Sequence, residues 1–214
     1  MARTRGTEGY AEQTAATVAA CESIRSNDLN RPVRHLLPAA PARILDIGAG
    51  SGRDAAAFAA MGHRVVAVEP VAELRRWAEE LHPSRRITWI DDGLPRLARL
   101  NEWPRGFDVI QLQAVWMHLD RRARATAMPR LAGLLRPGGV LLMSLRHGPV
   151  PAGKRMFAVR GRETIALARA RGLRLVLHLE DQPSVLPGKP EVTWTRLAFR
   201  KGPVNQSASA ARLG

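Results

Sequence analysis

Residues 44–54 have the sequence Ile-Leu-Asp-Ile-Gly-Ala-Gly-Ser-Gly-Arg-Asp, in which an apolar run leads into a turn with three glycines. A second apolar run at 65–68 ends on Glu69. This order is that of the βαβ unit with which α/β proteins bind a nucleoside: a strand, a glycine-rich turn that begins a helix, and an acidic residue after the next strand. A dinucleotide site needs G-x-G-x-x-G, but Arg53 stands where the last glycine belongs. The turn therefore predicts a nucleoside ligand without a pyrophosphate.

Strand-like and helix-like segments alternate along most of the chain. Strands are predicted at 43–47, 65–68, 87–90, 107–112, 140–145, 173–179 and 193–199. Helices are predicted at 10–21, 31–37, 54–61, 72–81, 94–100 and 162–170, and from the N-cap Asp120 through Leu135. No helix separates the last two strands, so they are expected to pair antiparallel. The pattern predicts a three-layer, doubly wound α/β fold whose seven-stranded sheet is mostly parallel, with an antiparallel last strand.

Length and composition indicate one α/β domain with short appendages. The chain has 214 residues, of which 45% are hydrophobic. We expect an N-terminal helical lid at 1–40, the main domain at 41–202 and a flexible tail at 203–214. The single Cys21 excludes a disulfide framework or a cysteine-rich zinc site and favours a reducing, cytoplasmic compartment. No apolar run reaches the ~18 residues of a membrane span, and no signal peptide is predicted.

Positive charge is concentrated in the second half of the chain. Residues 1–107 carry a net charge of +2 and residues 108–214 a net charge of +12. Such a half can attract nucleic acid, phosphorylated substrates or an anionic surface. A solvated, arginine-rich face is the simpler interpretation, and we favour it because no interleaved aromatic residues or RNA-binding motif accompany the charge.

Four segments appear in a fixed order between about Ala42 and Lys201. They are the turn Asp-Ile-Gly-Ala-Gly-Ser-Gly at 46–52, the strand that ends on Glu69, Phe-Asp-Val-Ile-Gln-Leu-Gln-Ala-Val-Trp-Met-His-Leu at 107–119, and Leu-Leu-Arg-Pro-Gly-Gly-Val-Leu-Leu-Met at 134–143. With this order and spacing the chain resembles the class I S-adenosylmethionine-dependent methyltransferases. The resemblance implies S-adenosylmethionine as cofactor and S-adenosylhomocysteine as its product.

The resemblance also implies a set of cofactor contacts. Glycines in the turn let the backbone approach the ligand, and free N–H groups at a helix N-terminus suit the cofactor's carboxylate. Asp46 either accepts from the turn's amides or meets the cofactor's ammonium group. Glu69 is expected to bind both ribose hydroxyls, because a carboxylate accepts two hydrogen bonds. The expected cofactor-binding residues are Asp46, Gly48, Ala49, Gly50, Gly52, Arg53, Glu69, Pro70, Asp91, Asp92, Gly93 and Gln113.

Within this set three positions have alternatives. Asp91 or Asp92 would hold the adenine edge, and Asp92 followed by Gly93 is the better match. Gln113 would meet the methionine part of the cofactor through either its side-chain carbonyl oxygen or its backbone. Arg53 would either cap the following helix or reach the cofactor's charged end.

The acceptor side is predicted from residues after the fourth and fifth strands. His118 and His147 are candidate general bases, needed only when the acceptor must lose a proton. For His118 we favour a packing role. Arg146 is a candidate anion anchor, and Tyr10 a candidate acceptor contact on the N-terminal lid, with simple helix packing as its alternative.

Missing signatures narrow the reaction. No Asn/Asp-Pro-Pro-aromatic motif follows the fourth strand, no Pro-Cys pair is present for covalent attack, and no cluster of metal-binding residues is apparent. The leading hypothesis is therefore a methyltransferase for an O, N or S atom of a small-molecule acceptor, with no metal and no membrane association. The alternatives are an RNA methyltransferase that docks through the basic C-terminal half and a non-catalytic S-adenosylmethionine-binding protein. A nucleic-acid partner is not favoured.

Overall fold

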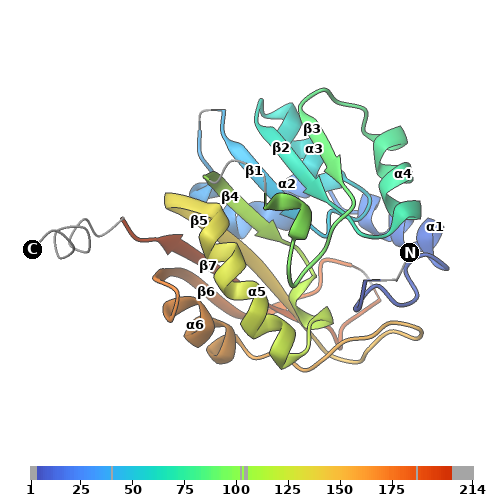
Figure 1. Ribbon diagram of the computed structural model, residues 1–214. Coiled ribbons are helices and arrows are strands. Elements are labelled where there is room, and N and C mark those ends of the chain that lie inside the picture. The colour runs from blue at the N-terminus through green and yellow to red at the C-terminus, as the bar shows by residue number, and fades with distance from the viewer. Residues whose placement is uncertain (1–3, 40, 102, 104–105, 187, 204–214) are drawn as a thin grey trace, which may run out of the picture.

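The structure is a computed structural model that describes residues 4–39, 41–101, 103, 106–186 and 188–203. Within these residues seven strands form one sheet in the order β3-β2-β1-β4-β5-β7-β6 (Figure 1). The strands are β1 (Arg43–Ile47), β2 (Arg64–Val68), β3 (Ile87–Ile90), β4 (Phe107–Leu112), β5 (Leu135–His147), β6 (Leu173–Pro183) and β7 (Thr193–Lys201). The helices are α1 (Thr14–Glu22), α2 (Ser26–Asn30), α3 (Arg53–Ala60), α4 (Ala72–Leu81), α5 (Arg121–Leu134) and α6 (Gly161–Arg169). Shorter 3-10 turns are η1 (Arg31–Leu36), η2 (Ala98–Leu100) and η3 (Trp116–His118).

The sheet has the predicted topology. Strands β1 to β5 pair parallel with their neighbours, and β7 is antiparallel to both β5 and β6. The doubly wound α/β fold with its antiparallel last strand is thus confirmed. The direction of winding reverses between β1 and β4, and this reversal opens a crevice at the carboxyl ends of the two strands.

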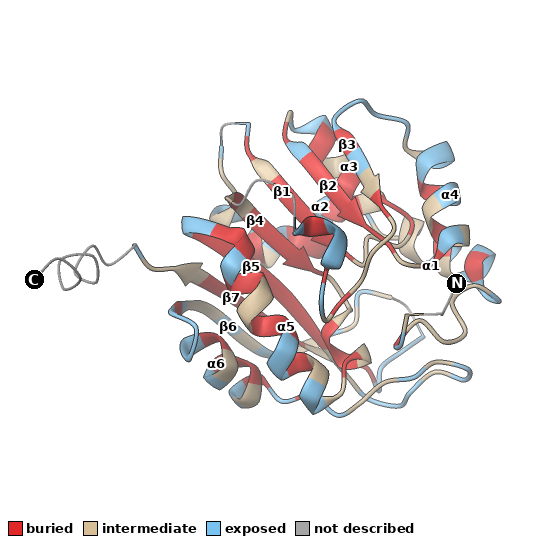
Figure 2. Cartoon of the chain, viewed as in Figure 1, coloured by how far each residue is buried: buried red, intermediate tan, exposed pale blue. Residues whose placement is uncertain are grey.

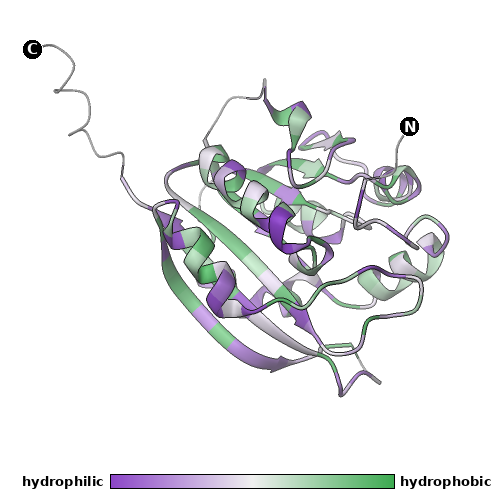
Figure 3. Ribbon diagram, turned by 60° about the horizontal axis from the view of Figure 1, so that its bottom comes forward, coloured by the Kyte–Doolittle hydropathy of each residue, from purple (hydrophilic) through white to green (hydrophobic). Residues whose placement is uncertain are grey.

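Helices cover both faces of the sheet and bury its apolar side chains. One core cluster joins α3 and η1 to the sheet face that carries Ile44 and Val65. The other joins α5 and α6 to the face that carries Leu45 and Val66. Figure 2 shows buried residues along the central strands, and Figure 3 shows the apolar residues concentrated there. Both faces are covered, which explains why the strands read as apolar runs rather than as alternating patterns.

The segment 94–100, predicted as a helix, is mostly irregular. Only Ala98–Leu100 forms a 3-10 turn, and Leu97 has a left-handed backbone with φ +48°. Pro95 has no N–H to donate, and Asp92 Oδ2 instead accepts from the backbone N–H of Arg99 at 2.7 Å. The Arg99 N–H is thus bonded to a side chain rather than to a backbone carbonyl oxygen, as it would be in a regular helix.

Several other boundaries also differ from the prediction. The residues between the predicted helices at 10–21 and 31–37 include a further short helix, α2. Strand β5 begins at Leu135, before the Pro137–Gly139 turn, and that turn falls at an irregularity in its pairing with β4. The predicted cap of α5 is present, with Asp120 Oδ1 accepting from the N–H of Ala123 at 2.8 Å.

Two absences hold for the described residues. No described helix combines the length and apolar character that a membrane crossing requires. In the same part of the chain, no three His, Cys, Asp or Glu side chains gather as a metal site would require. The predicted tail lies outside the described residues from position 204 onward.

Candidate functional site

The glycine-rich turn lies at the crevice between β1 and β4. Gly48, Gly50 and Gly52 all have positive φ angles, of 68°, 59° and 85°. A Cβ at Gly48 would lie 2.6 Å from Val115 Cγ2, so this position requires glycine for both its conformation and its packing. A Cβ at Gly50 would meet nothing nearer than the Gly48 carbonyl oxygen at 4.0 Å. The turn is therefore tightly packed on one side and open at Gly50.

Glu69 follows β2 and is buried beside this turn. Its Oε2 accepts from the N–H of Gly50 and its Oε1 from the N–H of Val71, each at 2.9 Å. Burial raises the pKa of the Glu69 carboxyl to about 7, although the two backbone hydrogen bonds act in the opposite direction. Arg75 Nη1 donates to the Glu69 carbonyl oxygen at 2.6 Å. The carboxylate is thus held in one position at the strand end.

Asp46 and Gln111 form a second buried polar pair on β1 and β4. They are register partners, and both are about 2% exposed. Asp46 Oδ2 and both polar side-chain atoms of Gln111 have no hydrogen-bond partner in the described part of the chain. Burial, and then the nearby Asp54 carboxylate, raise the pKa of Asp46 well above its usual value. Buried polar atoms normally have hydrogen-bond partners. These unpartnered atoms therefore indicate that a polar ligand supplies the missing hydrogen bonds or that the Asp46 carboxyl carries a proton.

Two cavities of about 170 Å³ each lie on either side of the turn. The Glu69 cavity is lined by the N-terminal segment 4–7 and by Tyr10, Gly48, Gly50, Glu69, Pro70, Val71, Gly93, Leu94, Gln113, Val115 and His118, among others. The Asp46 cavity is lined by residues that include Asp46, Ala49, Arg53, the loop 183–186, Trp194 and Arg196. Cys21, Gly48, Gly50, Gln113 and Ala114 line both cavities. The two cavities are therefore neighbours around the glycine turn.

Tyr10 and His118 meet at one end of the Glu69 cavity. The Tyr10 hydroxyl lies 3.0 Å from His118 Nε2, and His118 Nδ1 lies 2.8 Å from the Arg155 carbonyl oxygen. Because a carbonyl oxygen only accepts, Nδ1 carries the ring proton and Nε2 accepts from Tyr10. Burial lowers the pKa of His118, which favours the neutral ring, and raises the pKa of Tyr10. The pair thus presents a basic imidazole nitrogen behind a hydroxyl group.

Lys154 holds the N-terminal segment against this pair. Its Nζ donates to the Gly9 carbonyl oxygen at 2.8 Å and lies 3.5 Å from the centre of the Tyr10 ring. A Cβ at Gly9 would lie 2.4 Å from the Gly153 carbonyl oxygen, so the two backbones are in close contact. The segment that carries Tyr10 is therefore docked on the chain that follows β5.

Helix α1 is fastened over the other side of the turn. Glu22 Oε1 accepts from Ser51 Oγ at 2.6 Å and lies 3.2 Å from His82 Nε2. Arg53 Nη1 donates to the Cys21 carbonyl oxygen at 2.8 Å, and its Nη2 pairs with Asp54 at 2.8 Å. Arg53 thus has contacts that tie α1 to α3 while it also lines the Asp46 cavity.

Several residues predicted for the site do not line either cavity. His147 Nε2 is 2.8 Å from Thr195 Oγ1, and Arg146 Nη1 donates to the Pro149 carbonyl oxygen at 2.7 Å. Gly52 is the left-handed residue that precedes α3 and packs near Trp89 and Ala78.

The two acids after β3 have structural partners. Asp91 pairs with Arg75 at 3.3 Å, and Asp92 Oδ1 accepts from the N–H of Gly93 at 2.7 Å. Neither acid lines either of the two cavities, whereas Gly93 lines the Glu69 cavity. At this end of the site, the structure brings together Glu69, Pro70 and Gly93.

Other residues at the site carry no signal in the sequence. Trp194 and Arg196 reach the Asp46 cavity from β7, and Val115 packs against Gly48. Lys154 lies in a Gly/Pro-rich crossing that predicts only a loop. Their positions depend on strand order and loop docking, which no local pattern encodes.

Comparisons with known proteins find methyltransferases. A family model described as a methyltransferase domain matches residues 44–139. An uncharacterized methyltransferase of Mycobacterium tuberculosis is 33% identical over 109 residues, which cover 50% of this chain and 40% of that protein. A ubiquinone biosynthesis O-methyltransferase of Xanthomonas campestris pv. campestris is 32% identical over 162 residues, which cover 73% of this chain and 62% of that protein. The chain spans 40% of the length of the first mycobacterial relatives that it matches.

A solved structure gives the same result over more of the chain. It is that of the 1,6-didemethyltoxoflavin-N1-methyltransferase of Burkholderia thailandensis, with bound 1,6-didemethyltoxoflavin and S-adenosylhomocysteine. The TM-score is 0.60 at 25% sequence identity, and the match covers 88% of this chain and 89% of the other.

Proposed function

Because the chain belongs to the class I S-adenosylmethionine-dependent methyltransferases, we propose that it transfers a methyl group from S-adenosylmethionine to an O, N or S atom of a small molecule. Two similar proteins support this acceptor class. One is an N1-methyltransferase that holds 1,6-didemethyltoxoflavin, and the other is an O-methyltransferase of ubiquinone biosynthesis.

The residues around the glycine turn fit the cofactor. Glu69 would accept hydrogen bonds from the ribose hydroxyls, and Pro70, Gly93 and Leu94 would enclose the adenine. The open space above Gly50 lets a ligand approach the backbone directly. The buried, unpartnered Asp46 Oδ2 is suited to the ammonium group at the methionine end. When bound, the cofactor supplies the methyl group from its sulfonium.

The Tyr10–His118 pair would act on the acceptor. The neutral imidazole has Nδ1–H fixed on the Arg155 carbonyl, so Nε2, which accepts from the Tyr10 hydroxyl, is the nitrogen that can receive a proton through or in place of that hydroxyl. An acceptor with an O–H or N–H group would lose its proton to this nitrogen as it takes up the methyl group. This assigns His118 a catalytic role in place of the packing role favoured by the sequence.

The docked N-terminal segment would align the two ligands and exclude water. Residues 4–7 line the Glu69 cavity, and Gly6 packs against the His118 carbonyl, where a Cβ would lie at 2.9 Å. Methyl transfer from a sulfonium is an in-line displacement, so alignment and desolvation can supply much of the rate.

The position of Glu69 is the observation that carries the proposal, because the carboxylate is buried at a strand end and faces the cavity. Calorimetric titration with S-adenosylhomocysteine should show binding to the wild-type chain and a large loss in Glu69→Ala. The matched control is Glu79→Ala, which removes an exposed carboxylate of α4. Absence of binding to the wild-type chain, or equal affinity in Glu69→Ala, contradicts the assignment.

A transfer experiment tests the acceptor class. S-adenosylmethionine with a labelled methyl group is incubated with the chain and an extract of the source organism, which is then separated into small molecules, protein and RNA. The proposal expects label among the small molecules that depends on Glu69. Label confined to the RNA or protein fraction would overturn the acceptor class and leave the cofactor assignment intact.

A further inference from the structure

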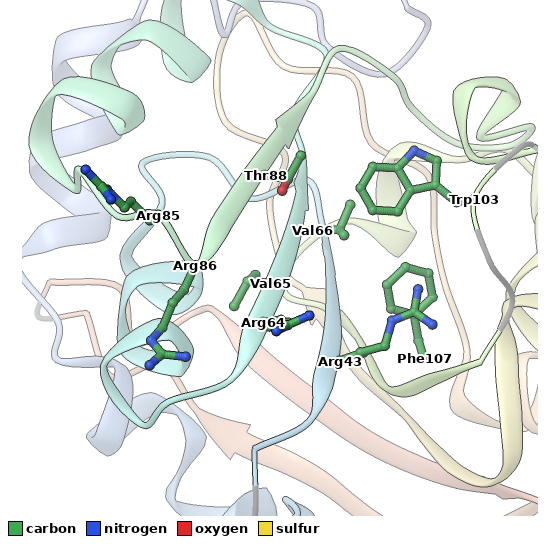
Figure 4. Close-up of a pocket in the computed structure, with 9 residues that line it drawn as sticks. All are labelled: Arg43, Arg64, Val65, Val66, Arg85, Arg86, Thr88, Trp103 and Phe107. Atoms are coloured by element: carbon green, nitrogen blue, oxygen red, sulfur yellow. The ribbon is translucent and has the colours of Figure 1, made fainter.

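A separate cleft of about 450 Å³ lies at the amino ends of the first strands. Four arginines and two aromatic residues dominate its lining: Arg43, Arg64, Arg85, Arg86, Trp103 and Phe107 (Figure 4). The crevice that contains the Glu69 and Asp46 cavities, which we call the cofactor crevice, lies at the opposite, carboxyl ends of the same strands. The two sites therefore do not overlap. We refer to this region as the arginine cleft.

Strand register brings three of these arginines into one row. Arg43 of β1 is the register partner of Arg64 of β2. Val65 pairs with Ile87, which places Arg86 beside Arg64 at the start of β3. The Arg86 guanidinium donates to the Gly62 carbonyl oxygen at 3.2 Å and points away from the other two (Figure 4). Like charges on neighbouring strands repel one another, so Arg43 and Arg64 favour an anion that lies between their guanidinium groups.

The described residues provide little compensating negative charge. None of the residues that line the cleft is acidic. The neighbouring Asp108 uses Oδ2 for the backbone N–H of Arg43 and Oδ1 for the Arg136 side chain. The Arg64 side chain forms no hydrogen bond or ion pair with another described residue. The Arg64 guanidinium is therefore available for an added anion.

The cleft also offers flat apolar surface. Figure 4 shows the Trp103 ring facing Val66, and the Arg43 side chain reaching the Phe107 ring. The Arg43 guanidinium lies 5.2 Å from the centre of that ring, and Trp103 is partly exposed. An indole next to guanidinium groups suits a ligand that has both a planar ring and phosphate oxygens.

We propose that the arginine cleft binds a nucleoside phosphate, with its phosphates on Arg43 and Arg64 and its base against Trp103. Guanidinium forks match phosphate oxygens in pairs, and a phosphate group offers more oxygens and more negative charge than a single carboxylate. The ligand is either a free nucleotide or the end of a nucleic-acid strand, since both present the same groups. This proposal does not depend on methyl transfer, because the cleft and the cofactor crevice are at opposite ends of the strands.

The test is calorimetric titration of the full chain with GTP, guanosine and tripolyphosphate at about 0.15 M salt. We expect GTP to bind, guanosine and tripolyphosphate to bind at least tenfold more weakly, and Arg64→Gln to lose at least tenfold in GTP affinity. Arg64→Lys should fall between, because it keeps the charge and loses the planar fork. Trp103→Leu should also weaken GTP but leave tripolyphosphate unchanged.

Two controls keep the result specific. Arg174→Gln removes an exposed arginine from β6, at the other edge of the sheet, and should leave GTP affinity unchanged. Glu69→Ala should also leave it unchanged, which separates this cleft from the cofactor crevice. Equal losses in Arg64→Gln and Arg174→Gln, or tripolyphosphate binding as tightly as GTP, would overturn the proposal.

A short single-stranded RNA distinguishes the two sources of the ligand. If RNA binds more tightly than GTP and loses affinity in Arg64→Gln, the ligand is a strand end. If GTP binds more tightly, the ligand is a free nucleotide. Circular dichroism of each variant confirms that the chain is folded.

Discussion

The two ends of the parallel strands carry opposite charges. The first three strands begin on or beside an arginine and end on or beside a carboxylate; the pairs are Arg43 and Asp46, Arg64 and Glu69, and Arg86 and Asp91. Parallel strands align their equivalent ends, so a pattern repeated along the chain becomes a basic edge and an acidic edge of one sheet.

The two edges manage their charge differently. At the carboxyl edge Glu69 is buried, receives two backbone N–H groups and has a pKa of about 7. At the amino edge Arg64 is exposed to water, which screens its repulsion with Arg43. The acidic edge is therefore built for a fixed ligand geometry, whereas the basic edge is solvated at Arg64.

The largest effect is expected for His118→Asn at the acidic edge. If His118 is the base, the variant should lower methyl incorporation into the small-molecule fraction by about 10²-fold or more, the usual range for general-base catalysis. Its affinity for S-adenosylhomocysteine should stay within about twofold.

The pH profile separates catalysis from packing. Since burial lowers the pKa of His118 below its usual value, wild-type activity at saturating S-adenosylmethionine should fall only at pH values below about 6.5. Tyr10→Phe keeps the aromatic ring and should lose less activity. An unchanged rate in His118→Asn would return this residue to a packing role.

A smaller loss is expected in the affinity of Glu69→Ala for S-adenosylhomocysteine. Hydrogen bonds to a charged group contribute about 1.5–3 kcal/mol, which corresponds to roughly a 10- to 100-fold change in the dissociation constant. Calorimetry measures it directly. The same titration of Arg64→Gln should give the wild-type value, and a comparable loss there would remove the distinction between the edges.

The pH dependence of cofactor affinity is the next effect in size. The pKa of Glu69 is raised to about 7, so its carboxyl gains a proton as the pH falls through 7. Ribose binding that needs the ionised carboxylate should therefore weaken below pH 7, by up to about tenfold per pH unit, and level off above it. Glu69→Gln should show a flat profile between pH 5 and 8.

The smallest effect is expected at the basic edge. Arg64→Gln removes the middle one of three like charges in cross-strand register and should raise the free energy of unfolding by a few tenths of a kcal/mol at low salt. The difference should vanish near 1 M salt, where the charges are screened. Urea denaturation measures both values. A lower stability for Arg64→Gln at low salt would show that Arg64 has a stabilising contact that outweighs the repulsion.

The excess charge of the C-terminal half is partly internal. Arg124 is 2% exposed, donates to the Ala158 carbonyl at 3.0 Å and pairs with Glu163 at 3.4 Å. Lys201 Nζ donates to the carbonyl oxygens of Ala132 and Leu135. Net charge along the sequence therefore overstates the positive surface of this half, whereas the row at the arginine cleft lies mostly in the nearly neutral first half.

The fold was predictable because its signals are local. Apolar runs bounded by Gly, Pro and Asp give β1, β3 and β4 their correct bounds, and the missing helix between the last two strands gives their antiparallel pairing. The prediction of a helix at 94–100 was wrong, because Asp92 and Pro95 organise this segment through contacts that helix propensity does not include.

The candidate site was predictable on one side only. Gly48 and Glu69 lie next to each other because consecutive parallel strands place equivalent ends together. His118 and His147 differ in their hydrogen-bond partners, and the sequence around each histidine does not reveal those partners. His118 receives Tyr10 from a segment 108 positions away, whereas His147 turns to Thr195 on the neighbouring strand.

By itself the sequence determined the strand and helix pattern, the glycine turn and the acid that follows the next strand, since these depend on backbone conformation and short-range periodicity. Only the tertiary structure decided which polar groups lie side by side: Tyr10 with His118, Asp46 with Gln111, and Arg43 with Arg64. The physical reason is that these pairs arise from strand order, register and loop docking, which depend on packing energies summed over the whole core.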